Sequence, residues 1–158
     1  MDYRLAITIV IVFVGASTIF LLSTNEQTEI TNFEECINVG NPVMESYPRQ
    51  CRAGERTFVE DIGNELEKSD LIRLTTPRPN EKITSPLIIK GEARGTWFFE
   101  ADFPIQILNE DGEVLGEHYA TVDPPATWMT EDFVPFTGNL EFIPDTNRGT
   151  LILQKDNP

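Results

Sequence analysis

The sequence has little of what catalytic and nucleic-acid-binding sites use. It contains one histidine, His118, and two cysteines among 158 residues, and it has no Gly-x-Ser-x-Gly motif and no glycine-rich phosphate-binding loop. A nucleophile elbow and a nucleotide site are therefore not indicated. The 12 basic residues are outnumbered by 26 acidic ones, and the net charge of −14 disfavours contact with the phosphates of nucleic acid. We expect no catalytic residue, no cofactor and no nucleic-acid partner.

A long uncharged stretch lies near the start of the chain. The 18 residues that begin at Leu5 and end at Leu22 carry no charge, and as a helix they span about 27 Å, close to the thickness of a bilayer core. Arg4 precedes them and Glu26 follows, which by the positive-inside rule places the remainder of the chain outside the cytoplasm. We predict a single-pass transmembrane anchor over residues 1–22 and a polar spacer over 23–32. The alternative is a signal peptide cleaved near Ala16.

Both cysteines fall in a short segment, residues 33–61. Cys36 and Cys51 have 14 residues between them, and two cysteines in an extracytoplasmic chain most simply pair with each other. On the loop-entropy estimate such a bond contributes about 3 kcal/mol. Metal binding is the alternative, but the segment lacks a histidine to complete a zinc site. We predict a disulfide-stapled α+β unit with a helix over 33–37, capped by Thr31 or Asn32, and strands over 47–52 and 56–60.

The remainder reads as all-β, after a charged connector over 62–70 with room for one helical turn. Its central stretch runs from Gly95 to Leu108, and every odd position from Trp97 to Ile107 is apolar, which is the period of a half-buried strand. A hairpin turn follows at 109–112. Short strands separated by proline and glycine indicate a β-sandwich over 71–158, with strands predicted at 71–74, 87–92, 98–108, 114–122, 134–142 and 149–155.

The large apolar side chains of this region divide into two sets. One set follows the alternation, and we expect it to form the core: Trp97, Phe99, Phe103, Phe136 and Phe142. The other set is harder to bury under the same alternation: Phe98, Trp128 and Met129. If these three are exposed, they form an apolar patch suited to a protein or glycan partner. The alternative is that they close one end of the sandwich.

Two minor interpretations concern the acidic residues. A pair of carboxylates is the machinery of a glycosidase, and the candidates are Glu100, Asp102, Asp123, Glu131 and Asp132, although nothing in their spacing singles out a pair. Calcium prefers oxygen ligands in loops, and residues 109–112 supply part of such a loop.

Four segments resemble a known family: 85–87, 91–100, 128–136 (WMTEDFVPF) and 149–158. They are similar to an immunoglobulin-like bacterial domain, the one associated with the GerMN domain of sporulation and germination proteins. The resemblance covers residues 71–158 and implies an immunoglobulin-like sandwich in an extracytoplasmic, usually membrane-tethered protein. No catalytic residues carry over from it. The family pattern continues past the position of Pro158 into a last strand, so the resemblance implies either a truncated chain or an open sheet edge that a partner completes.

These features together predict a membrane-anchored module of the cell envelope that binds or assembles with a protein or a wall glycan outside the membrane. The first alternative is a carboxylate-dependent carbohydrate-active or cell-wall enzyme. The second is a regulator that inhibits a neighbouring enzyme through the disulfide-stapled unit of residues 33–61, the cysteine module. Because the polar connector separates that module from the sandwich, we expect few contacts between the two.

Overall fold

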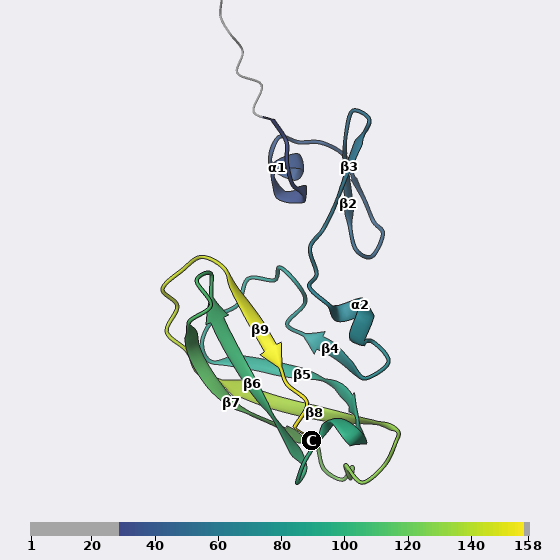
Figure 1. The fold of residues 1–158 in the computed structure, drawn as a ribbon, viewed down its shortest axis with the longest axis vertical. Helices are drawn as coiled ribbons and strands as arrows, with labels where there is room; N and C mark the ends of the chain where they lie inside the picture. Colours follow the sequence, from purple (N-terminus) through teal and green to yellow (C-terminus); the bar gives the residue numbers. More distant parts are fainter. Residues whose placement is uncertain (1–28, 157–158) are drawn as a thin grey trace, which may run out of the picture. The chain divides into compact units, whose positions relative to one another are not determined.

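The computed structural model describes residues 29–156. Six antiparallel strands between residues 72 and 153 form a two-layered domain. The strands pair in the order β4-β5-β8-β7-β6-β9. β7 pairs with β8 only from Ala120 to Val122, where the sheet passes from one layer to the other. Figure 1 shows β5 and β8 crossing β6 and β9 at a steep angle, as expected for a sandwich. The strands are β4 (Ile72–Thr76), β5 (Leu87–Arg94), β6 (Asp102–Asn109), β7 (Val114–Val122), β8 (Phe133–Leu140) and β9 (Gly149–Leu153).

The core lies between the layers and is centred on Phe103 of β6. This side chain is fully buried, and its ring centroid lies 4.9 Å from that of Phe136 on β8 and 5.2 Å from that of Phe98, in edge-to-face geometry. Trp97 contacts the same ring at 6.4 Å. Edge-to-face pairs of this kind contribute about 0.5–1.5 kcal/mol each beyond the buried area. The burial expected for Trp97, Phe103, Phe136 and Phe142 is confirmed.

The predicted strand over 98–108 is wrong at its start. Residues Gly95–Trp97 form a short 3-10 helix, η1, and a tight turn then joins Phe99 to Asp102, whose backbone groups exchange hydrogen bonds of 3.0 and 3.2 Å. β6 begins only at Asp102. The turn reverses the expected sides: Phe98 is 0% exposed and Phe99 is 48% exposed. Phe99 is therefore not a core residue, and the alternation holds only from Phe103 onward.

The cysteine module contains the helix α1 (Phe33–Asn38) and a small antiparallel sheet of β1 (Val43–Met44), β2 (Gln50–Ala53) and β3 (Arg56–Val59). The Asn32 side chain accepts a hydrogen bond of 2.9 Å from the backbone N–H of Glu35, which is a helix cap of the expected type. Cys36 and Cys51 form the predicted disulfide, which joins α1 to β2, and both are fully buried. The connector holds the expected single helical turn, α2 (Glu65–Lys68).

The predicted anchor between Leu5 and Leu22 lies outside the described residues. Within residues 29–156, no helix combines the length and the apolar character that crossing a membrane requires.

Candidate functional site

The expected aromatic patch is not formed as predicted, because Phe98 belongs to the core. Its ring is packed against Phe103 and is not exposed to solvent. Met129 is 76% exposed, and Trp128 is half-buried against the core. Both lie in the loop between β7 and β8. Of the three predicted residues, Met129 alone has the exposure that a contact residue requires, and Phe99 is an exposed aromatic that the alternation had placed inside.

Gly95 determines how the loop that carries Trp128 and Met129 lies on the domain. A Cβ atom at this position would meet the carbonyl oxygens of Thr130 and Trp128 at 2.0 and 2.2 Å. The N–H of Gly95 donates a hydrogen bond of 3.0 Å to the carbonyl of Asp132. The loop backbone can approach this closely because glycine has no side chain. The exposed Met129 is therefore carried by a loop whose base is fixed on the sandwich.

The acidic candidates occupy separate structural roles. Glu100 lies in the tight turn before β6, whereas the carbonyl of Glu131 accepts a hydrogen bond of 3.2 Å from Arg94. Asp132 accepts one of 3.4 Å from the Thr130 hydroxyl. Burial raises the pKa of the Asp102 carboxyl, and the nearby charges of Asp156 and Glu100 raise it further. No contact that we observe among residues 29–156 joins Glu100 to Glu131 or Asp132.

In the hairpin turn at 109–112, the side chain of Asn109 is used in internal hydrogen bonds. The Asn109 side-chain oxygen accepts hydrogen bonds of 3.0 and 2.8 Å from the N–H groups of Asp111 and Glu113. Its amide nitrogen donates to the carboxylates of Glu113 and Asp145 at 3.1 and 3.2 Å. Asn109 thus closes the hairpin. Across the described part of the chain, no three or more His, Cys, Asp or Glu side chains are grouped to hold a metal ion.

Among residues 29–156, β9 is an edge strand of the six-stranded sheet. The pairing of β9 with β6 and the bond of 3.0 Å from the Gln154 N–H to the Pro104 carbonyl fix which groups point inward. The backbone groups of Thr150 and Ile152 bond to β6, and those of Leu151 and Leu153 point away from it. Within residues 29–156, the outward N–H and C=O groups of Leu151 and Leu153 have no backbone partner.

The side chains of these two edge residues point toward the core. Leu151 is opposite Ile107 and Leu153 is opposite Ile105, and directly opposed residues share a face of the sheet. Ile105 and Ile107 are buried, but Leu151 and Leu153 are only partly covered. They line a groove together with residues of the sandwich, namely Ile72, Leu74, Trp97, Leu115 and Phe142. The same groove is also lined by residues of the cysteine module and the connector, among them Phe33, Phe58 and Glu65. The indole N–H of Trp97 is buried and has no hydrogen-bond partner in the described residues.

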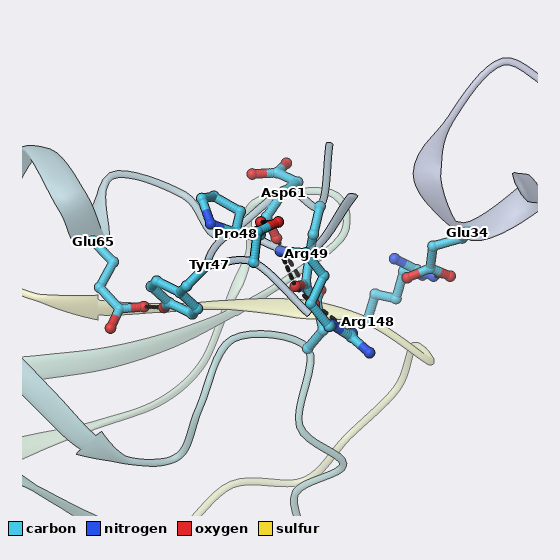
Figure 2. A network of polar contacts seen from close by, with 10 residues as sticks. Glu34, Tyr47, Pro48, Arg49, Asp61, Glu65 and Arg148 are labelled. Carbon is cyan, nitrogen blue, oxygen red and sulfur yellow. Dashed lines mark hydrogen bonds and ion pairs between the residues drawn. The ribbon is translucent and has the colours of Figure 1, made fainter. Parts of the chain in front are cut away.

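Polar side chains join the cysteine module to the sandwich and its connector. Figure 2 shows Tyr47 directed at Glu65, with its hydroxyl donating a hydrogen bond to that carboxylate. Arg78, on the sandwich side, donates to the same carboxylate at 3.0 Å and stacks over the Tyr47 ring at 5.1 Å. Farther along the chain, Arg148 pairs with Glu34 of α1. The polar connector therefore does not prevent side-chain contacts between the two parts.

A second set of contacts centres on Glu60, a buried residue that lies just before the connector. Arg49 donates to its carboxylate through Nε at 2.9 Å and through Nη2 at 2.6 Å, and Asn80 donates to the same carboxylate at 3.2 Å. The hydrogen bonds from Arg49 hold the pKa of Glu60 below its usual value. Tyr47 is half exposed, and its partial desolvation, followed by the hydrogen bond to Glu65, raises its pKa to about 12. The contacts of this junction thus favour the ionised form of Glu60 and the protonated form of Tyr47.

Comparison with known proteins identifies one family. The family described as the Gmad2 immunoglobulin-like domain of bacterial spore germination matches residues 71–158. No curated protein and no solved structure matches the chain. The matched residues begin just before β4 and include every strand of the sandwich.

Proposed function

Since the chain belongs to the family of immunoglobulin-like domains of bacterial spore germination, we propose that it is a germination-related module of the cell envelope that binds a partner rather than catalysing a reaction. The family match over residues 71–158 is the observation that carries this proposal. The exposed Met129 supplies a surface through which a protein or wall glycan can be held.

The proposed location is the outer side of the cell membrane, with the stretch between Leu5 and Leu22 as a single-pass anchor. Two features support it. The stretch is uncharged over 18 residues, which suits a bilayer core of roughly 30 Å. The Cys36–Cys51 disulfide suits an oxidising compartment outside the cytoplasm.

Protease treatment of intact spheroplasts tests the location. The protein made in a bacterial host should be degraded by protease added outside, while a cytoplasmic marker survives. Survival of the protein until the cells are lysed would contradict an extracytoplasmic domain.

Site-directed photo-crosslinking in living cells tests the binding role. Crosslinkers placed at the exposed positions Met129 and Thr150 should capture an envelope partner, whereas one at Glu55, an exposed turn residue of the cysteine module, serves as the control. Co-sedimentation with purified wall sacculi tests a glycan partner in the same way. Turnover of wall polymers that is lost in the variants Glu100→Ala, Glu131→Ala or Asp132→Ala would instead indicate an enzyme.

A further inference from the structure

We propose that the loop between β7 and β8 binds a partner protein that presents an apolar side chain surrounded by lysine or arginine. Residues 123–132 form this loop, and we call it the Met129 loop. Met129 supplies the apolar centre of the contact, and the carboxylates of Glu131 and Asp132 supply its charged rim. The inference rests on the proposed binding function and names the class of partner. Figure 1 shows the loop at the end of the sandwich that also carries η1.

The Met129 loop is fixed to the sandwich at both of its ends. The N–H of Asp123 donates a hydrogen bond of 2.9 Å to the carbonyl of Pro135, and its carboxylate accepts one of 3.2 Å from the Thr137 hydroxyl. At the other end, Arg94 donates a hydrogen bond of 3.2 Å to the carbonyl of Glu131. A loop that is ordered before binding loses little conformational freedom when a partner binds. An exposed side chain on such a loop is therefore well suited to recognition.

The side chains at the tip of the loop favour a protein partner over a glycan. Met129 is 76% exposed, whereas the neighbouring Trp128 is half-buried against the core. Sugar rings are commonly bound by stacking on exposed planar aromatic rings, and the Trp128 ring is used in packing. A thioether side chain is flexible and polarizable, and it makes favourable contacts with aromatic rings and other apolar groups. The group that Met129 contacts is accordingly an aromatic or aliphatic side chain.

Charge restricts the partner further. The loop contains Asp123, Glu131 and Asp132 and no basic residue. Within residues 29–156, we observe no hydrogen bond or ion pair of the Glu131 carboxylate. Arg94, which bonds to the backbone of the loop, is stacked over the Phe133 ring at 4.1 Å. Exposed carboxylates beside an apolar tip attract lysine and arginine, and they repel both anionic lipid and a second copy of this chain, whose net charge is −14.

The ligand side of the test uses a dye-labelled probe peptide, Gly-Arg-Lys-Trp-Lys-Arg-Gly, whose tryptophan is the apolar anchor. Its binding to the full chain in phosphatidylcholine nanodiscs is measured by fluorescence anisotropy, with empty nanodiscs as the blank. A second peptide has glycine in place of tryptophan, and a third has glutamate in place of every lysine and arginine. The probe should bind at least about threefold more tightly than either of the others. Absence of probe binding would overturn the inference.

A double-mutant cycle tests whether the anchor contacts Met129. Met129→Ala should weaken binding of the tryptophan peptide by about threefold and leave binding of the glycine peptide unchanged, because the lost contact exists only with tryptophan. Met44→Ala, at an exposed methionine of β1, is the matched control and should change neither. Equal effects of Met129→Ala on both peptides would contradict the assigned contact.

The rim carboxylates are tested by removing charge while keeping side-chain shape. Glu131→Gln combined with Asp132→Asn should weaken probe binding by about threefold at low salt and make it less dependent on salt. The control is Glu45→Gln combined with Glu55→Gln, which removes two charges from exposed positions of the cysteine module. Equal losses from the two double variants would show that binding follows net charge alone, and the inference would then be wrong.

Failure of this inference is distinguishable from failure of the proposed function. An envelope protein captured from position 129, with no binding of the probe, would overturn the basic partner but preserve the binding role. Co-sedimentation with wall sacculi that Met129→Ala abolishes, with no probe binding, would identify a glycan instead. Crosslinks from position 129 to lipid or to a second copy of the chain would also overturn the inference. Probe binding that is coupled to Met129 and depends on Glu131 and Asp132 supports it.

Discussion

The tight turn that precedes β6 should be a point of backbone strain that substitution can relieve. Its two central residues, Glu100 and Ala101, have φ angles of 52° and 74°. Two consecutive positive φ values in a two-residue connection are the mark of a type I′ turn, for which Asn-Gly is the favoured sequence. The chain instead has Glu-Ala, so neither position has the residue that this conformation prefers. The test variant is Glu100→Asn combined with Ala101→Gly.

The expected gain in the free energy of unfolding is the balance of two opposing contributions. A side chain other than glycine in the left-handed region costs about 1–2 kcal/mol relative to its preferred conformation. Glycine at Ala101 removes this cost but gains freedom in the unfolded chain, which returns about 0.5–1 kcal/mol. Asparagine at Glu100 tolerates the left-handed region and removes a charge that raises the pKa of Asp102. We expect the double variant to raise the free energy of unfolding by about 1 kcal/mol.

Urea denaturation of the full chain, followed by near-ultraviolet circular dichroism, measures the change. Gly112→Ala is the matched control. Gly112 has a φ of 82°, and a Cβ atom there meets nothing within 4 Å, so this substitution adds the strain without a clash. It should lower the free energy of unfolding by about 1 kcal/mol. A double variant that is less stable than the parent, while Gly112→Ala behaves as expected, would refute the assignment of strain to this turn.

Three further predictions concern the core, the disulfide and the junction. Phe103→Ala should lower the free energy of unfolding by about 3–5 kcal/mol, because it removes the ring at the centre of the aromatic cluster; a loss below about 1 kcal/mol in urea denaturation would contradict that position. Replacement of Cys36 and Cys51 by alanine should lower the stability of the cysteine module by about 3 kcal/mol and leave the amide protons of β5 and β8 protected in hydrogen exchange; equal loss of protection in both parts would show one cooperative unit. Tyr47 should ionise near pH 12 in ultraviolet titration. Since its folded pKa is raised, its stabilising contribution is complete below the unfolded value of about 10 and is lost as the pH rises toward 12. Ionisation of every tyrosine near pH 10 would contradict its hydrogen bond to Glu65.

Local pattern predicted most strands of the sandwich closely. β7 has the predicted bounds, and β5, β8 and β9 differ from the predictions by one or two residues at their ends. A period of two is a strong signal in β5 and β8, where buried and exposed side chains alternate, because a slip of one residue would turn the apolar side chains to solvent. The disulfide was predictable for a different reason, since the chain has two cysteines and no others with which they could pair.

The candidate site was less predictable, and Phe98 and Phe99 show why. Both are large aromatic residues in an apolar run, and alternation placed Phe99 inside and Phe98 outside. The structure reverses them because η1 and the turn at Glu100 and Ala101 interrupt the strand. Neither residue of that turn is the glycine or asparagine that signals positive φ. The sequence therefore contained no local sign that the phase would change.

The sequence by itself determined which segments alternate, which cysteines pair and how acidic the protein is, because these depend on neighbouring residues or on composition alone. Only the tertiary structure decided that β9 pairs with β6 at an edge of the described sheet and that the Tyr47 hydroxyl reaches Glu65. The physical reason is that an edge and a junction are defined by which strands and side chains come together across long separations in the chain. Local periodicity does not predict these long-range contacts, since they follow from how the two layers pack around Phe103.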